Sequence, residues 1–352
     1  MKPIIFALLF ISVLFSCGKK ETKIIPKEFN VVEVEMILED SLLNVRALEV
    51  YIEENATFAT SKGEIGAIFR TKGGWTRAVK KKLLFDTLNL NFRSISNRKN
   101  AGFALSIGSP AYLIKLGEIE DSLVYQENHP KAFYDSMDFW NDQEGIAIGD
   151  PTDDCISVII TRDGGNTWNK LSCEQLPKAK EGEAAFAASD TNISIVGDKI
   201  WVATGGKASR VLFSPDKGKT WEVFDTPIIQ GLETTGIYSL DFYDELNGFA
   251  IGGDYTKPDD NANNKIRTQD GGKTWQLVAE NENPGYRSCV QYVPNSNAKS
   301  IVAVGFKGVD ISNDSGGSWK HISDEGFYTI RFVNDSVAYA AGKGRISKLK
   351  FR

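Results

Sequence analysis

One stretch decides the fold, and it reads Thr161-Arg-Asp163-Gly-Gly165-Asn-Thr167-Trp168. The pattern S/T-x-D-x-G-x-T/S-W returns three times further along the chain, at residues 214–221, 268–275 and 312–319. The four copies start 53, 54 and 44 residues apart. Repeats of about 40–50 residues with glycine and aromatic markers indicate a β-propeller or a solenoid.

Each copy suits a tight turn between two antiparallel strands. The aspartate carboxylate accepts hydrogen bonds from backbone N–H groups of the turn, and glycine adopts the positive φ that the turn needs. The tryptophan begins the next strand and buries its ring between neighbouring sheets. We therefore predict a structural and not a catalytic role for the turn residues Asp163, Asp216, Asp270 and Asp314, and for Trp168, Trp221, Trp275 and Trp319.

A second marker gives the number of repeats. An apolar strand that ends in glycine precedes each copy, and the same marker occurs without a good copy at 102–108 and 337–342, and in a weaker form at 56–60. Seven units divide residues 31–352 into lengths of about 46 residues, which suits four short strands with their turns. We predict an all-β fold, a seven-bladed β-propeller of four-stranded antiparallel blades, with six or eight blades as alternatives.

The two ends of the chain are expected to close the ring. The last unit, 327–352, has room for only three strands, and residues 36–43 would supply its fourth. Closure matters because an open ring leaves unpaired strand edges at both ends.

The N-terminus reads as an export signal. After Met1 and Lys2, an apolar run over 4–15 is shorter than the roughly 20 residues of a membrane-spanning helix and is typical of a secretory signal. The run ends in Leu-Phe-Ser before Cys17, which resembles a bacterial lipobox. We predict a lipid anchor on Cys17 that attaches the protein to a membrane, with an ordinary signal peptide and an incidental cysteine as the alternative.

This interpretation divides the chain into three parts. They are a lipoprotein signal peptide over 1–16, the lipidated Cys17 with a flexible tether over 17–30, and a single propeller domain over 31–352. The protein is then exported to the bacterial cell envelope. Gly18, where sorting by aspartate would need Asp, favours the outer membrane.

Export to an oxidising compartment makes disulfides possible. Cys155 and Cys173 lie nearly symmetrically about the turn at 163–166, so a hairpin there would bring them together. We predict a disulfide between them, with two buried free thiols as the alternative, and we assign Cys289 to the core.

Composition argues against several functions. The net charge of −5 disfavours a nucleic-acid surface. Only His129 and His321 are present, which leaves little for a histidine metal site or catalytic triad. The acidic loop at 254–263 lacks EF-hand spacing, so we expect a solvated loop there, with a calcium site as the alternative. We expect no metal, no cofactor and a monomer.

Topology points to the site. The repeated turns join the third and fourth strands of a blade, so the loops between the second and third strands, and those between blades, lie on the opposite face. Polar and aromatic residues of those loops are candidates for one ligand pocket at the mouth of the central channel: Glu183, Tyr238, Arg287, Asp150, Asp254 and Arg210. The alternative is that these groups satisfy one another and the loop backbones.

The four turns resemble the Asp box, or BNR repeat, of sialidases and of the photosystem II stability/assembly factor family, over most of residues 45–350. Resemblance to the assembly factors implies binding of another protein at a membrane, without catalysis. Resemblance to sialidases implies a cluster of three arginines, a Tyr–Glu pair and an Asp acid. The sialidase Arg-Ile-Pro motif is absent, and the nearest segment is 69–72.

We therefore expect an exported, lipid-anchored propeller that binds a protein or a polar ligand at the channel mouth. The alternative is a glycoside hydrolase acting on extracellular glycans, with catalytic candidates Glu183, Asp150 and Asp254. A propeller oxidoreductase is a third class, but the chain shows no cofactor signature.

Overall fold

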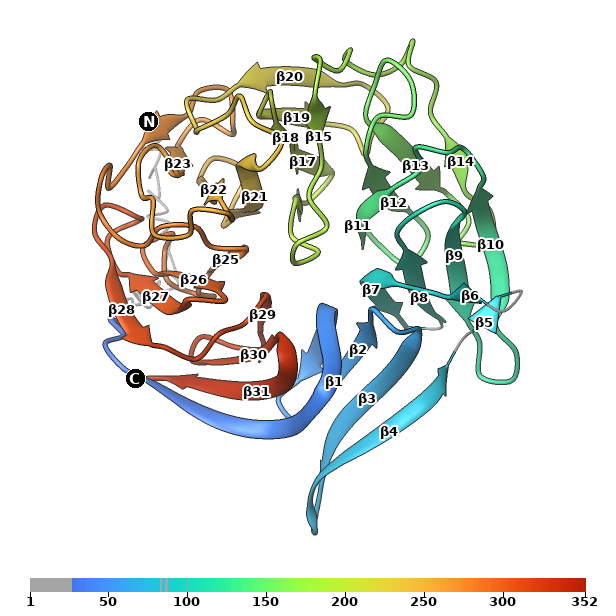
Figure 1. Ribbon diagram of the computed structural model, residues 1–352, viewed down its shortest axis with the longest axis horizontal. Helices are drawn as coiled ribbons and strands as arrows, with labels where there is room; N and C mark the ends of the chain where they lie inside the picture. Colours follow the sequence, from blue (N-terminus) through green and yellow to red (C-terminus); the bar gives the residue numbers. More distant parts are fainter. Residues whose placement is uncertain (1–26, 83, 86–87, 100) are drawn as a thin grey trace, which may run out of the picture.

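The computed structural model describes residues 27–82, 84–85, 88–99 and 101–352. The predicted signal peptide and Cys17 lie outside these residues. The regular elements of the described chain are β-strands, arranged as four-stranded sheets around a central axis (Figure 1). Among these residues there is no helix long and apolar enough to cross a membrane.

Five blades are antiparallel sheets of four consecutive strands, numbered here from the axis outward. Blade 2 contains β7 (Phe92–Arg98), β8 (Ala101–Ser106), β9 (Ala111–Leu116) and β10 (Ser122–Glu127). Blade 3 contains β11 (Tyr134–Phe139), β12 (Gly145–Gly149), β13 (Ser157–Thr161) and β14 (Asn169–Lys170). Blade 4 contains β16 (Ile193–Val196), β17 (Lys199–Ala203), β19 (Arg210–Ser214) and β20 (Glu222–Asp225). Blade 5 contains β21 (Thr235–Phe242), β22 (Gly248–Asp254), β23 (Lys265–Thr268) and β24 (Gln276–Leu277), and blade 6 contains β25 (Cys289–Tyr292), β26 (Ile301–Gly305), β27 (Gly308–Ser312) and β28 (Lys320–Ser323).

Blades 7 and 1 share one long strand. Blade 7 contains β29 (Thr329–Phe332), β30 (Val337–Ala341), β31 (Lys343–Phe351) and the first part of β1 (Val32–Ile52), and the rest of β1 begins blade 1 with β2 (Asn55–Thr60), β3 (Glu64–Thr71) and β4 (Gly74–Lys82). Short strands lie between blades: β5 (Leu84–Phe85) pairs with β6 (Leu88–Asn89), and β15 (Glu183–Ala184) pairs with β18 (Gly205–Gly206).

The ring closes through the two ends of the chain, as predicted. β1 pairs with β31 from Val32↔Phe351 to Glu39↔Arg345. The paired stretch therefore begins four residues before the expected segment 36–43. The predicted seven-bladed, all-β propeller is confirmed.

The four repeated turns all lie on one face. The turn of each blade donates a backbone hydrogen bond to the turn between the first two strands of the same blade, for example Gly164 N to Gln143 O at 2.9 Å and Gly271 N to Leu246 O at 3.0 Å. We call this side the turn face. The loops between the second and third strands, with the connections between blades, form the opposite mouth face.

Within each turn the aspartate holds the backbone. Asp163 accepts hydrogen bonds from the Asn166 and Thr167 N–H groups at 3.0 and 2.9 Å, and from the Thr167 hydroxyl at 2.7 Å. These hydrogen bonds outweigh burial and lower the pKa of the Asp163 carboxyl. Gly165 has a φ of 76° and sits against Phe103 of the preceding blade, where a Cβ would lie 2.3 Å from the ring. The motif thus shapes the turn and packs one blade on the next.

Candidate functional site

A stretch of chain crosses the middle of the ring. We call residues 185–192, between β15 and β16, the central segment (Figure 1). Arg46 of blade 1 donates a hydrogen bond from Nη1 to Ala188 O at 2.6 Å, and Arg93 of blade 2 donates one to Ala187 O at 3.2 Å. Arg331 of blade 7 donates to Asp190 O at 3.0 Å. Because groups from several blades hold it, the segment separates a pocket on the mouth face from a cavity deeper in the channel.

The mouth pocket has a volume of about 530 Å³ and opens on the face that the topology predicted. Connections between blades and loops after second strands supply most of its wall. Its side chains include Arg46, Arg93, Phe133, Asp150, Phe186, Glu233, Tyr238, Tyr255, Tyr286, Phe306 and Tyr328.

Aromatic rings form one wall of this pocket. Phe186 stacks on Tyr238 with 4.1 Å between ring centroids, and Tyr286 meets Tyr238 edge-on at 4.8 Å. At the rim, Tyr255 and Phe306 are 49% and 44% exposed. Exposed aromatic rings around a concave site are typical of surfaces that bind other molecules.

Two arginines carry positive charge at this pocket. The guanidinium of Arg46 lies 3.8 Å from the ring centroid of Tyr328. Within the part of the chain that the structure describes, neither Arg46 nor Arg93 forms an ion pair, and the buried Nε of each has no hydrogen-bond partner. Burial, reinforced by the charge on Arg46, lowers the pKa of Arg93 to about 10, so both groups stay charged at neutral pH.

One predicted carboxylate reaches the pocket. Asp150, in the loop after β12, accepts a hydrogen bond from Ala185 N at 2.8 Å. Burial raises the pKa of Asp150 to about 6, against the effect of that hydrogen bond. The neighbouring Asp135 is fully buried, and burial together with Asp150 raises its pKa far above the ordinary range. With Asp135 protonated, Arg46 and Arg93 leave an excess of positive charge at neutral pH.

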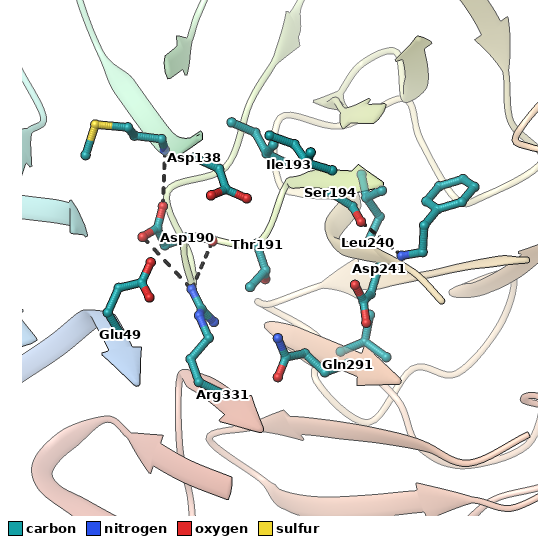
Figure 2. A pocket seen from close by; sticks show the side chains of 14 residues that line it. Glu49, Asp138, Asp190, Thr191, Ile193, Ser194, Leu240, Asp241, Gln291 and Arg331 are labelled. Atoms are coloured by element: carbon teal, nitrogen blue, oxygen red, sulfur yellow. Dashed lines mark hydrogen bonds and ion pairs between the residues drawn. The ribbon is translucent and has the colours of Figure 1, made fainter. Parts of the chain in front are cut away.

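A second cavity of about 180 Å³ lies in the channel on the other side of the central segment (Figure 2). The carboxylates of Glu49, Asp138, Asp190 and Asp241 face it, together with Arg331. Burial, with a smaller contribution from Asp138, raises the pKa of Glu49 to about 7, and burial raises that of Asp241 to about 7. We call this space the acidic cavity.

The expectation that all six candidate residues surround one pocket is wrong. Tyr238 and Asp150 line the mouth pocket, whereas Glu183 and Arg210 form a buried ion pair of 2.5 Å next to it. Their side chains are 0% and 8% exposed. Glu183 also accepts a hydrogen bond from the Thr204 hydroxyl at 2.7 Å. The pair is satisfied within the fold, which is the alternative that the sequence left open.

Arg287 and Asp254 are also engaged elsewhere. Arg287 donates from Nε to the buried Asp310 at 2.6 Å, and His321 contacts the other oxygen of that carboxylate at 3.0 Å. Asp254 accepts hydrogen bonds from the backbone and hydroxyl of Thr256 at 2.9 and 2.6 Å. These bonds outweigh burial and lower the pKa of Asp254.

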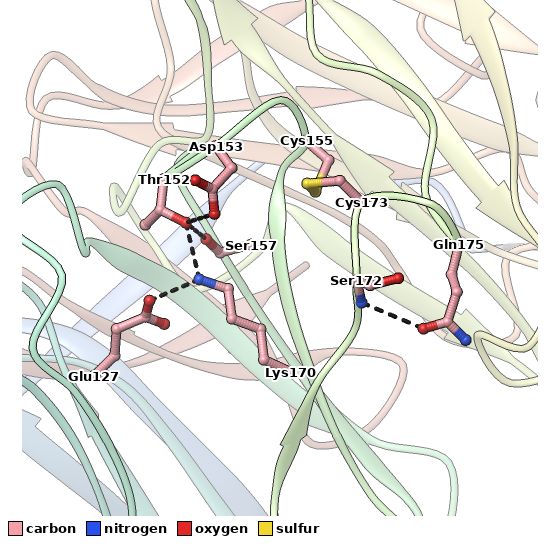
Figure 3. Close-up of a disulfide and its surroundings, with 9 residues drawn as sticks. All are labelled: Glu127, Thr152, Asp153, Cys155, Ser157, Lys170, Ser172, Cys173 and Gln175. Atoms are coloured by element: carbon pink, nitrogen blue, oxygen red, sulfur yellow. Dashed lines mark hydrogen bonds and ion pairs between the residues drawn. A yellow bond between two sulfur atoms is a disulfide. The ribbon is translucent and has the colours of Figure 1, made fainter.

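Cys155 and Cys173 are joined in a disulfide (Figure 3). Cys155 precedes β13 and Cys173 follows β14, so the bond links the two outer strands of blade 3. Beside it, Lys170 bridges Glu127 of blade 2 at 2.7 Å and the Thr152 hydroxyl at 2.9 Å. Cys289 is a buried free cysteine.

The sequence predictions missed the two arginines and most of the aromatic wall. Arg46 and Arg93 lie on innermost strands of blades without a repeated turn, where no motif marks them. The signal available was position: Phe186, Tyr286 and Tyr328 each stand in a connection between blades, which the topology places at the mouth.

No family model matches the chain, and no curated protein matches it. Solved structures do. The structure described as YCF48 bound to D1 peptide has a TM-score of 0.65 and 13% identity, over 94% of this chain and 98% of that chain. The chain has the β-propeller fold. YCF48 from Cyanidioschyzon merolae (TM-score 0.63, 11% identity, 91% and 99% covered) and the WD40 β-propeller domain of Doa1 (TM-score 0.56, 13% identity, 91% and 97% covered) resemble this propeller over similar lengths.

Proposed function

We propose that this propeller binds a polypeptide segment in the mouth pocket, and that the segment presents a carboxylate to Arg46 and Arg93. The observation that carries the proposal is the pair of buried arginines without an ion-pair partner in the described residues, beside an aromatic wall. A buried guanidinium without a carboxylate is costly, and a ligand carboxylate would supply the missing partner.

The surroundings of the pocket suit a polypeptide. Leu232, Tyr255 and Phe306 are exposed by 44–55%, and Tyr255 and Phe306 border the opening. Apolar and aromatic side chains around a charged centre are the usual composition of a protein-binding site. The structural likeness to YCF48, described as bound to a D1 peptide, supports a ligand of this class.

The finer expectations belong to the same proposal. The four repeated turns are then Asp boxes, and residues 31–352 form one propeller domain. A lipid on Cys17 holds the protein at the bacterial cell envelope, in the outer membrane. Such an anchor would keep the mouth pocket near partners that are assembled at that membrane.

A glycoside hydrolase is the second candidate, and it rests on Asp150 alone. Asp150 lines an aromatic pocket, and burial raises its pKa to about 6, as general acid catalysis requires. Glu183 is held by Arg210, and Asp254 by Thr256. A glycan-hydrolysis screen of wild type and Asp150→Asn separates the two functions: turnover that depends on Asp150 would replace the binding proposal.

Selection from a phage-displayed peptide library tests the binding proposal. Wild-type protein is the target, and an Arg46→Gln/Arg93→Gln variant is used for counter-selection after its fold has been verified by circular dichroism. We expect the enriched peptides to combine acidic and aromatic or aliphatic residues. Enrichment of basic peptides, or equal capture by the double variant, would contradict the proposal.

A further inference from the structure

One interface between blades lacks an aromatic group that other interfaces contain. Trp168 packs on Phe103 of the preceding blade, with 6.3 Å between ring centroids, and Trp319 packs on Phe249 at 5.6 Å. The repeated turns of blades 4 and 5 place glycines against Ile160 and Trp201 of the preceding blades in the same way. Large side chains thus fill these interfaces near the turn face.

The interfaces on either side of blade 7 also contain rings. Trp75 meets Tyr339 edge-on with 6.0 Å between centroids, which joins blade 1 to blade 7. Phe29 and Phe351 meet at 6.1 Å in the hydrophobic cluster shared by blades 6 and 7. The interface between blades 1 and 2 differs from these.

A cleft of about 710 Å³ lies between blades 1 and 2. Small residues line it on both sides, including Gly66, Ala67 and Ala78 of blade 1 and Ala101 and Gly102 of blade 2. No aromatic side chain is among the described residues that line it. Figure 1 shows β3 and β4 projecting outward from the ring beside this interface.

The sequence explains the missing rings. The turn after β9 of blade 2, residues 117–121, carries no tryptophan, and its Ile119 is fully exposed. On the facing side, β2 presents Thr57 to the cleft, whereas β8 and β22 present Phe103 and Phe249 to the next blade. Both partners of the usual aromatic contact are therefore absent here.

We propose that this cleft binds an aromatic side chain, preferably tryptophan, of a partner polypeptide. The cleft is continuous with the hydrophobic cluster that joins the two blades, since Ile65, Ile95 and Leu116 belong to both. A tryptophan side chain buries roughly 150–250 Å² and is the group that fills equivalent positions in this molecule. Thr57 and Asn97 supply oxygen atoms that a buried indole N–H needs.

The probe for this site is N-acetyl-5-fluorotryptophanamide, observed by ¹⁹F NMR during titration with the described propeller in its full chain. We expect saturable binding that is at least about tenfold tighter than that of N-acetylleucinamide measured by competition. Nuclear Overhauser contacts between the indole and the methyl groups of Ala78 and Ala101 would locate it. Equal affinity for the leucine analogue would contradict an aromatic site.

A matched pair of variants separates this cleft from the mouth pocket. Ala78 is exposed, so Ala78→Trp is expected to fold, and its indole would cover the cleft and weaken probe binding at least about tenfold. Val79→Trp, on the opposite face of the same strand, should bind like wild type. Unchanged binding in Ala78→Trp would overturn the proposal. So would a probe that is lost only when Arg46 and Arg93 are replaced, because it would then occupy the mouth pocket.

Discussion

The guanidinium of Arg46 lies over the ring of Tyr328, 3.8 Å from its centroid, and this contact joins blade 1 to the connection that enters blade 7. Arg46 stands on β1, the strand that closes the ring by pairing with β31. The same side chain lines the mouth pocket and holds the central segment through Ala188. Ring closure and the proposed binding site therefore depend on one residue.

The buried ion pair of Glu183 and Arg210 should be essential for stability. Glu183→Gln removes the charge that compensates Arg210, and breaking such a pair typically costs about 3–5 kcal/mol. Urea unfolding of wild type and variant measures the loss. Asp225→Asn, which breaks the exposed pair with Lys180, is the control and should cost less than about 1 kcal/mol. Equal effects of the two substitutions would show that the buried pair has no special role.

The acidic cavity predicts lower stability at higher pH. The pKa values of Glu49 and Asp241 are raised to about 7, so the native state binds protons that the unfolded chain releases near pH 4. This stabilisation is complete below the unfolded pKa and is lost as the pH rises from about 4 to about 7. We expect the free energy of unfolding to fall by roughly 1–3 kcal/mol across this range.

A Glu49→Gln/Asp241→Asn variant is the control for this effect. Its side chains stay neutral, so its free energy of unfolding should change less between pH 4 and pH 8 than that of wild type. Urea denaturation at a series of pH values makes the comparison. An identical pH dependence in the two proteins would assign the effect to other groups.

The aspartate of each repeated turn should contribute stability individually. Asp216 accepts hydrogen bonds from Thr220 N at 2.8 Å, Thr220 Oγ1 at 2.7 Å and Ser214 Oγ at 2.9 Å. Asp216→Ala should therefore lower the free energy of unfolding by about 1–3 kcal/mol. Asp198→Ala, an exposed acid in the same blade, should have a smaller effect. Because these bonds lower the pKa of Asp216, wild type should lose this advantage only on acidification below its ordinary value of 3.8.

The disulfide of blade 3 should stabilise the propeller measurably. Cys155 and Cys173 are 18 residues apart, and closing a loop of that length is worth about 3 kcal/mol. Thermal unfolding with and without a thiol reductant tests this in wild type. The Cys155→Ala/Cys173→Ala variant should match reduced wild type and show no response to the reductant. A wild type indifferent to reduction under unfolding conditions would contradict the prediction.

The fold was predictable because repeated local chemistry determines it. The turn residues around Asp163 and Trp168 carry their own hydrogen bonds and their own contact with the preceding blade, so four copies establish the repeat without long-range information. The spacing also indicated that residues near the N-terminus complete the last blade. Blade 1 was less visible, because its hairpin at Thr71 and Gly74 lacks the aspartate.

The site was predictable only as a face of the molecule. Topology places connections between blades at the mouth, which identified Tyr238 and Asp150. It does not say which polar groups pair with one another, and Glu183 with Arg210 satisfied each other instead of a ligand. Those pairs are 27 residues apart in sequence and are set by three-dimensional packing, as are the positions of Arg46 and Arg93.

Calorimetric titration of the most enriched selected peptide tests the central claim most directly. Wild type is compared with Arg93→Gln, and Arg162→Gln, a partly exposed arginine on the turn face, is the matched control. Loss of a charged hydrogen bond is worth about 1.5–3 kcal/mol, so we expect Arg93→Gln to weaken binding by about 10- to 100-fold and the control to bind like wild type. The same affinity in all three proteins would contradict peptide binding at the mouth pocket.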